Sequence, residues 1–316
     1  MRKLKLVLYR DGRPGHEKQS LGIIRSLNQY VHVDISEITV EHLSFLQSLV
    51  QYICYFLHIS GSQEIRSDAD LLIGTGSRTH IPMLLSKRIT NSRVVTCMTP
   101  LRILRSSFDL CFVPIHDQTK EADNLFFTVG PPNLSIASTS QDRKKGLILV
   151  GGEDTDSHVW HSEMISGQIT EVLNRSEDMT WTIASSPRTP AQTEKNLKDL
   201  DSAYDNVLFF PFSQTNPGWV EAQYAVNKTV WVTGDSISMV YEALSAGCNV
   251  GILPVEWKRK NNKFHLSENY LIDRSRVITL KQWADGDAQW RENRPLHEAD
   301  RCARELLKRW WPENLP

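Results

Sequence analysis

The 316-residue sequence predicts an α/β protein with two doubly wound domains, each built on a parallel sheet. Short β-rich runs recur along the chain, and several are separated by stretches long enough for crossover helices. The series restarts after a polar, serine-rich segment at 135–145, and the chain is longer than one hydrophobic core usually serves. We therefore expect a domain at 1–140 and a second at 141–295, facing one another across a cleft.

The β-rich runs and two apolar segments give the expected elements in order. The first sheet is predicted from the runs at 4–9, 31–36, 70–75, 93–97, 109–113 and 125–129. The second is predicted from 146–150, 179–184, 206–210, 229–233, 248–253 and 277–280. The apolar segment 45–59 is too short to span a bilayer and is expected to be a core helix rather than a membrane contact. A terminal helix at 296–311 is expected to pack back on the first domain.

Composition excludes several classes of protein. A net charge of −1 provides no global attraction for nucleic acid. The five cysteines contain no C-x-x-C pair and are odd in number, which argues against a zinc site or a disulfide framework. No signal peptide is recognisable, so we expect a cytoplasmic protein. Residues 1–30 carry seven Lys or Arg against two acidic residues, so peripheral contact with an anionic membrane at its inner face is a second expectation.

The loop after the first run, 10–22, is a candidate ligand site. Gly12 and Gly15 allow a tight turn and the close approach of a ligand. The next helix is expected to begin near His16, where its free N–H groups favour an anion. His16 can exchange a proton near neutral pH, so it is the first candidate for a catalytic base, with Asp11 the second. The alternative is a strand-to-helix turn with a surface histidine.

The second domain has a similar pair of glycines after its first run. The N–H groups of Gly151 and Gly152 could hold a diphosphate. In the next loop, Ser185 and Thr189 can donate hydrogen bonds, and Arg188 can bind phosphate with its full positive charge. A capped turn explains the same residues without a ligand.

Metal binding is not expected in this domain. The pattern D-x-D follows the two glycines, but it occurs four times in the chain and so carries little information. His158 and His161 are too close in sequence to be two zinc ligands on one helix face, and we expect them at the surface.

The segment 210–256 holds the remaining candidates. Asn216 lies in an N-P-G turn before an amphipathic helix. The string "GDSIS" precedes another helix, and the hydroxyls of Ser236 and Ser238 with the helix N–H groups suit a phosphate. Glu242, further along, suits the two hydroxyls of a ribose. Asp235 would repel phosphate, so it is expected to cap the helix or orient a neighbour.

These motifs together resemble a known family. The strings "DGRPGHEKQSLG", "SSPRTP", "NPG" and "VTGDSISMVYEA" are similar to the mitochondrial-fission family of elongated-mitochondria proteins, whose bacterial relatives are described as glycosyltransferases. The likeness covers most of the chain, and the string at 235–243 is its most specific part. Pro187 stands where the family pattern has an arginine, which leaves Arg188 as the one arginine of that loop.

The resemblance implies a GT-B-like fold of two Rossmann-like domains. It implies metal-independent transfer of a sugar from a nucleotide-sugar to a lipid-linked or cell-envelope acceptor, with no cofactor. His16 would lie near the acceptor and Glu242 near the donor ribose. Two alternatives stay open, namely a nucleotide-sugar epimerase on the same fold and a non-catalytic scaffold or membrane-recruitment protein.

Overall fold

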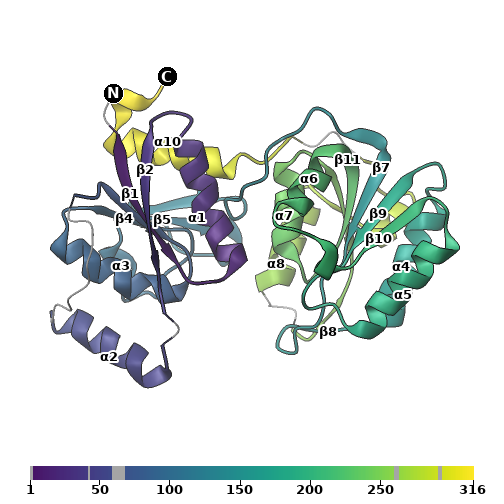
Figure 1. Cartoon of the computed structure of the whole chain (residues 1–316), viewed down its shortest axis with the longest axis horizontal. Coiled ribbons are helices and arrows are strands. Elements are labelled where there is room, and N and C mark those ends of the chain that lie inside the picture. The colour runs from purple at the N-terminus through teal and green to yellow at the C-terminus, as the bar shows by residue number, and fades with distance from the viewer. Residues whose placement is uncertain (1–2, 42, 59–67, 260–262, 291–293) are drawn as a thin grey trace. The chain divides into compact units, whose positions relative to one another are not determined.

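The computed structural model describes every residue of the chain except 1–2, 42, 59–67, 260–262 and 291–293. It divides into two compact units, one formed by Met1–Leu134 with His297–Pro316 and the other by Ser135–Leu296. Each unit has a six-stranded sheet in which every pair of neighbouring strands is parallel (Figure 1). The predicted fold class, two Rossmann-like α/β domains, is confirmed.

The N-terminal unit has the strand order β2-β1-β3-β4-β5-β6. Its strands are β1 (Leu4–Arg10), β2 (Val33–Thr39), β3 (Leu71–Gly74), β4 (Arg93–Thr96), β5 (Leu110–Pro114) and β6 (Leu125–Thr128). Its helices are α1 (Pro14–Leu27), α2 (Phe45–Phe56), α3 (Ser77–Ile89) and α10 (Glu298–Trp310). The chain runs from β1 to β2 and then returns to β3 on the other side of β1. Loops that follow β1 and β3 therefore meet at the point where ligands of such sheets usually bind.

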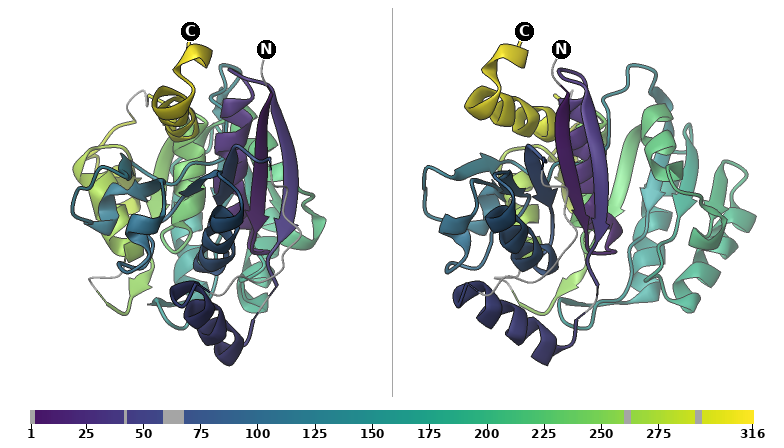
Figure 2. Two further views of the ribbon diagram at one scale, coloured as in Figure 1. Left: turned by 90° about the vertical axis from the view of Figure 1, so that its left-hand side faces the viewer. Right: turned by 60° about the vertical axis from the view of Figure 1, so that its left-hand side comes forward.

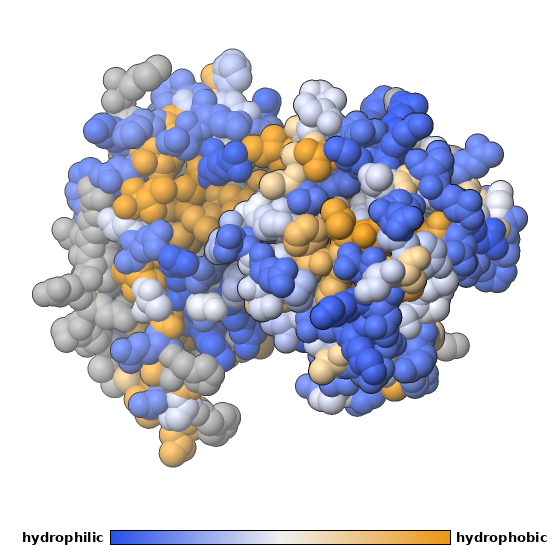
Figure 3. All heavy atoms as spheres, turned by 45° about the vertical axis from the view of Figure 1, so that its right-hand side comes forward, coloured by the Kyte–Doolittle hydropathy of each residue, from blue (hydrophilic) through white to orange (hydrophobic). Residues whose placement is uncertain are grey.

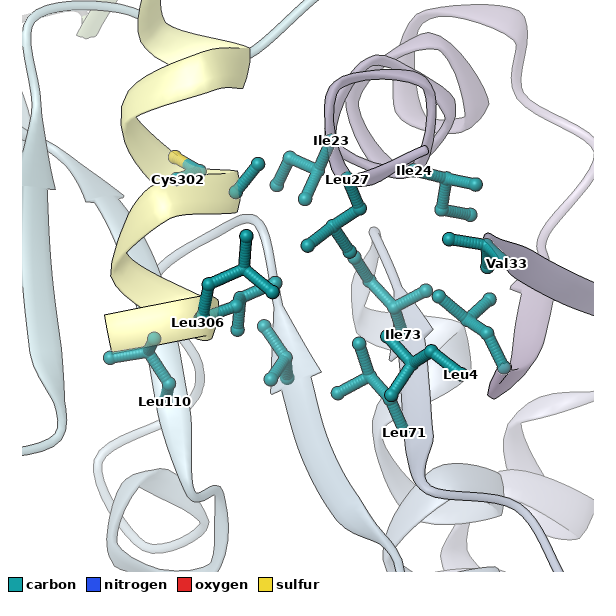
Figure 4. Close-up of a cluster of buried hydrophobic side chains, with 14 of the residues drawn as sticks. Leu4, Ile23, Ile24, Leu27, Val33, Leu71, Ile73, Leu110, Cys302 and Leu306 are labelled. Atoms are coloured by element: carbon teal, nitrogen blue, oxygen red, sulfur yellow. The ribbon is translucent and has the colours of Figure 1, made fainter. Parts of the chain in front are cut away.

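Alternation along β1 sends its side chains to two separate cores. Leu6 and Leu8 point to the face that α1 and α10 cover, whereas Val7 and Tyr9 pack with α3 on the other face. Figure 4 shows Cys302 and Leu306 of α10 beside the α1 side chains that pack over the sheet. Because α10 buries its apolar side here, the last helix of the chain is part of the N-terminal core.

The C-terminal unit has the strand order β10-β9-β7-β11-β12-β14. Its strands are β7 (Asp142–Leu149), β9 (Thr180–Ala184), β10 (Val207–Phe210), β11 (Asn227–Thr233), β12 (Asn249–Leu253) and β14 (Ile278–Thr279). Its helices are α4 (Ser162–Asn174), α5 (Ala191–Ala203), α6 (Trp219–Val226), α7 (Ile237–Ser245), α8 (Lys263–Asp273) and α9 (Leu280–Ala284). Here the order reverses between β7 and β11, so the loops after these two strands hold the corresponding position.

The twelve predicted strands all form, with ends that differ by a few residues from the predicted ones. The sequence did not indicate the antiparallel ribbon of β8 (His158–Val159) and β13 (Glu256–Trp257). In the part of the chain that the structure describes, no helix has the length and apolarity needed to cross a membrane.

The prediction of a core helix at 45–59 is wrong. Helix α2 forms there, at the end of the N-terminal unit and next to α3 (Figure 2). Most of its large apolar side chains are exposed, since the helix contacts the unit through its other side. Periodicity correctly identified an apolar face, but it does not determine whether another element covers that face.

Candidate functional site

The loop after β1 brings the two predicted catalytic residues into contact. Asp11 Oδ2 lies 2.7 Å from His16 Nδ1, and Asp11 Oδ1 accepts a hydrogen bond from the Arg13 N–H at 3.1 Å. The Asp11 side chain is 1% exposed, whereas that of His16 is 27% exposed. Helix α1 begins at Pro14, two residues before the expected start, so His16 lies inside its first turn. The result is a buried carboxylate with a half-buried histidine above it.

Gly76, in the loop after β3, closes this pair from the neighbouring strand. A Cβ atom on Gly76 would lie 2.3 Å from Asp11 Oδ2 and 2.5 Å from His16 Nδ1. Its φ of 103° is also one that side-chain-bearing residues rarely adopt. Position 76 therefore needs glycine for two reasons, backbone conformation and the close approach of the pair.

The geometry gives His16 a defined chemical role. A carboxylate on Nδ1 favours the tautomer that carries its proton on Nδ1, and this leaves the lone pair of Nε2 available. Such a histidine can take a proton from a hydroxyl, and the ionised Asp11 stabilises the imidazolium that forms. The hydrogen bond makes Asp11 the positioning partner of His16 rather than a second, independent base.

His80, in α3 of the same unit, is a different kind of histidine. It is buried in α3, and its ring packs edge-on against Phe108 at 5.1 Å. Burial and, secondly, the charge of His16 lower the pKa of His80 to about 4. It is therefore neutral at physiological pH and belongs to the packing of the unit.

In the C-terminal unit, three loops meet after β7, β9 and β11. A Cβ atom on Gly151 would lie 2.1 Å from Asp235 Oδ2, and one on Gly152 would lie 2.0 Å from the Arg188 carbonyl oxygen. The Gly151 N–H donates to Thr233 Oγ1 at 2.8 Å, and the Gly152 N–H donates to Asp235 Oδ2 at 3.2 Å. Both glycines serve the packing of the loops, and the N–H groups that the sequence suggested for a diphosphate are engaged internally.

Arg188 also has an internal partner, which corrects the expectation that it brings a full positive charge. Its Nη2 donates to Asp235 Oδ2 at 2.7 Å, and its Nη1 donates to the Gly152 carbonyl at 3.2 Å. The Asp235 side chain is 1% exposed and requires this cation to offset its charge, while the Arg188 side chain remains 43% exposed. Asp235 therefore orients Arg188, as one of its two expected roles, and the pair is close to electrically neutral.

The start of α7 is the open part of this loop cluster. Ser236 precedes the helix but makes no side-chain cap, because its hydroxyl donates to Asp235 Oδ2 at 3.0 Å instead. Among the described residues, the N–H groups of Ile237 and Ser238 have no hydrogen-bond acceptor. The Ser238 side chain is exposed, so its hydroxyl is accessible beside two N–H groups that lack acceptors at a helix N-terminus. Such an end favours an anion.

The predicted binding residues Glu242, Ser185 and Thr189 are more enclosed than Ser238 and have partners within the protein. Glu242 is buried on α7, one turn beyond Ser238, and its carboxylate is the second cause, after burial, that raises the pKa of Tyr224 well above its usual range. Ser185 and Thr189 are in the cluster, but their hydroxyls donate to Glu194 and to the Gly151 carbonyl, respectively.

Asn216 is exposed in the loop before α6, which follows the edge strand β10. Its backbone carbonyl accepts a hydrogen bond from the Trp219 N–H at 3.0 Å. The structure does not bring it to the loop cluster.

Two buried side chains lie beside the cluster, His158, which was predicted at the surface, and Glu268, which was not predicted as a site residue. His158 is not at the surface, since its ring is buried with Nε2 3.0 Å from the Gly152 carbonyl oxygen and Nδ1 2.8 Å from the Ser157 hydroxyl. Glu268 of α8 accepts a hydrogen bond from Trp257 Nε1 at 3.0 Å and lies beside Gly234. Burial raises the pKa of Glu268. No sequence pattern predicted the ribbon of β8 and β13, in which His158 lies and from which Trp257 contacts Glu268.

No group of three or more His, Cys, Asp or Glu residues arranged to hold a metal ion is found within the described ranges.

Comparison with solved structures defines the class of fold. The chain is similar to the UDP-GlcNAc 2-epimerase of Neisseria meningitidis bound to UDP-GlcNAc, with a TM-score of 0.54 and 12% identity over 97% of this chain and 100% of the other. It is similar to the glycosyltransferase SnogD of Streptomyces nogalater, with a TM-score of 0.52 and 12% identity over 97% and 96%. It also resembles the MnaA–UDP structure from S. aureus, with a TM-score of 0.51 and 11% identity over 98% and 97%. At these identities the likeness establishes the GT-B fold alone.

The family is defined by sequence. The chain belongs to the family described as Mitochondrial fission ELM1, whose pattern matches residues 14–310. No curated protein matches the sequence.

Proposed function

We propose that this protein is a metal-independent glycosyltransferase that moves a sugar from a nucleotide-sugar to a lipid-linked or cell-envelope acceptor. The observation that carries the proposal is the open N-terminus of α7, where the N–H groups of Ile237 and Ser238 lack acceptors and the Ser238 side chain is exposed. It stands at the position where sheets of this topology bind nucleotides. The likeness to UDP-binding structures with the same fold supports the choice of ligand.

The donor would bind to the C-terminal unit through its diphosphate. The free N–H groups of α7 and the Ser238 hydroxyl meet the phosphate oxygens, and Arg188 adds donors from the side. Its Nε–H makes no hydrogen bond with any described residue, so the guanidinium can bind an anion without leaving Asp235. Glu242 binds the ribose hydroxyls from the next turn of α7.

The chemistry is an attack by an acceptor hydroxyl on the anomeric carbon of the sugar. His16 takes the hydroxyl proton on Nε2 as the new C–O bond forms, and the bond from that carbon to the diphosphate breaks with its electron pair. Asp11 holds His16 in the required tautomer and stabilises the imidazolium. The helix N-terminus stabilises the negative charge that grows on the leaving diphosphate.

A nucleotide-sugar epimerase is the second candidate, and the likeness to the Neisseria meningitidis epimerase favours it. This reaction needs acid and base groups around the sugar but no acceptor. Incubation of the protein with donor alone separates the two reactions, since an epimerised nucleotide-sugar identifies the epimerase. A scaffold, the third candidate, would bind no nucleotide-sugar at all.

Ligand-observed NMR with a panel of nucleotides and nucleotide-sugars tests the donor site. We expect one base to be preferred, and we expect Ser238→Ala and Glu242→Ala each to weaken binding by about tenfold, the loss of one charged or well-oriented hydrogen bond. Glu163→Ala, at an exposed position of α4, is the matched control and leaves binding unchanged. Failure to bind any member of the panel at millimolar concentration would refute the donor site and favour a scaffold.

Turnover of the preferred donor tests the base. His16→Asn is expected to lower turnover by about 10²- to 10⁴-fold while donor binding is retained. His161→Asn is the control, because that histidine is exposed and pairs with Glu256 at 2.9 Å. Equal turnover of the His16 variant and the control would remove His16 from the mechanism.

A further inference from the structure

Helix α2 exposes a continuous row of large apolar side chains. Six residues of the segment 46–57 are between 45% and 71% exposed, namely Leu46, Leu49, Val50, Ile53, Phe56 and Leu57. At about 100° per residue they fall within an arc of about 120° of the helix surface. Figure 3 shows apolar side chains at the lower end of the N-terminal unit, where Figure 1 places α2. We call these six residues the α2 face.

The opposite side of α2 holds the helix against the protein. Tyr55 is buried and donates a hydrogen bond from its hydroxyl to Ser107 at 2.8 Å, and Tyr52 packs against the same core. Ser48 and Gln51 share a pocket lining with residues of α3. The side that carries Ser48, Gln51 and Tyr55 therefore faces inward and the more apolar side faces outward, the reverse of an ordinary surface helix.

The start of α2 is well defined. A reciprocal capping box joins Ser44 and Gln47 at its start. The Ser44 N–H donates to Gln47 Oε1 at 2.8 Å, which defines the first turn. The exposed row belongs to a well-formed helix, and an apolar row of this kind in water marks an interaction site.

Two arginines lie beside α2, next to the side of the helix that contacts the unit. The segment 45–56 contains no charged residue. The guanidinium of Arg88 stacks on the Tyr55 ring at 4.2 Å, and Arg78 borders the inward side of the helix together with Glu41. The loop that leads to Ser107, which Tyr55 contacts, exposes Leu101, Arg102 and Ile103 in succession.

We propose that the α2 face docks on the surface of an anionic lipid bilayer. A single exposed helix with an uncharged apolar face and arginines beside it matches a bilayer, where the apolar groups enter the acyl boundary and the arginines meet lipid phosphates. A bilayer can cover such a face without shape complementarity, whereas a protein partner would need a surface of matching shape. This inference does not rest on the proposed glycosyl transfer, because α2 contributes nothing to the donor loops or to the Asp11–His16 pair.

Vesicle flotation with the whole protein tests the proposal. Binding is expected to vesicles of phosphatidylethanolamine with phosphatidylglycerol and to be weaker with phosphatidylcholine alone. The double variant Leu49→Gln/Ile53→Gln is expected to lose about tenfold or more of this affinity. Arg102→Gln is expected to lose about fivefold on anionic vesicles only.

Matched controls keep the result interpretable. Leu208→Gln and Ile136→Gln alter apolar residues of the C-terminal unit that are 60% and 54% exposed, and they leave vesicle binding unchanged. Circular dichroism and nucleotide binding of the α2 double variant are expected to match those of the unaltered protein.

Two results would overturn the proposal. One is the absence of vesicle binding by the unaltered protein, or equal binding by the α2 double variant. The other is self-association, measured by sedimentation velocity, that the double variant abolishes while vesicle binding is absent. That result would assign the face to a second copy of the chain.

Discussion

Acid should destabilise the N-terminal unit through His80. The pKa of this buried histidine is lowered to about 4 from the value of 6.5 that it has in the unfolded chain. As pH falls below 6.5, the unfolded chain binds a proton at this site and the folded unit does not. Stability that is fully present above 6.5 is therefore lost progressively as the pH approaches 4.

The size of the effect follows from the two pKa values. Each pH unit between them corresponds to about 1.4 kcal/mol, so the full difference is worth about 3 kcal/mol of unfolding free energy. His80→Gln removes the titrating group while it keeps a polar side chain toward Thr96, which lies 3.4 Å from His80 Nε2. Between pH 7 and pH 4, the free energy of unfolding of the variant should therefore fall by about 3 kcal/mol less than that of the unaltered protein.

The assay must resolve the two units. Seven of the nine tryptophans lie between residues 160 and 290, so intrinsic fluorescence reports mainly on the C-terminal unit. Urea unfolding read by pulse hydrogen exchange on peptides from β1 and β3 measures the N-terminal unit itself. If the free energy of unfolding falls equally in His80→Gln and in the unaltered protein on acidification, the acid sensitivity does not come from His80.

Two further predictions concern Gly76 and Glu268. Gly76→Ala should weaken the Asp11–His16 contact and destabilise the N-terminal unit by at least about 1–2 kcal/mol through backbone strain. Gly15→Ala is the control and should not destabilise the unit, because the space around its Cβ is open. Thermal unfolding compares the two variants, and equal stability would contradict the geometry. Glu268→Gln should stabilise the C-terminal unit at neutral pH and not below about pH 4. Burial raises the pKa of Glu268, so the folded unit favours the protonated carboxyl, and the stability that depends on this proton is lost as pH rises. Glutamine is neutral at every pH and avoids that loss. Urea unfolding at both pH values checks this, and a variant that is less stable at pH 7 would reverse the sign.

The sequence predicted where the strands lie along the chain, because parallel strands leave strongly apolar runs between turn residues. It also identified Asp11 and His16, but not the bond between them, which depends on the turn at Gly12 and on the close approach of Gly76 from another strand. The pairing of Arg188 with Asp235 joins positions 47 residues apart in sequence. Local pattern carries no information on such a contact, so the charge of Arg188 was overestimated.

Two interpretations were wrong for a common reason. His158 was expected at the surface and is buried, and the helix at 45–59 was expected in the core and exposes its apolar face. Burial depends on what packs over a residue, and His158 is buried because its ring packs against Trp160 and against Trp257, its partner in the two-residue ribbon. Periodicity and residue type identify faces and candidate groups, whereas tertiary neighbours decide which of them are covered.

The proposed donor site depends on whether the N-terminus of α7 binds the diphosphate of a nucleotide-sugar. The most direct measurement is the backbone amide NMR spectrum of the protein titrated with UDP and with the other nucleoside diphosphates. We expect one of them to shift the amide signals of Ile237 and Ser238 most, in a saturable way, and we expect Ser238→Ala to weaken these shifts. Unchanged signals at these two amides at millimolar nucleotide, or saturable shifts confined to other loops, would contradict the proposed donor site.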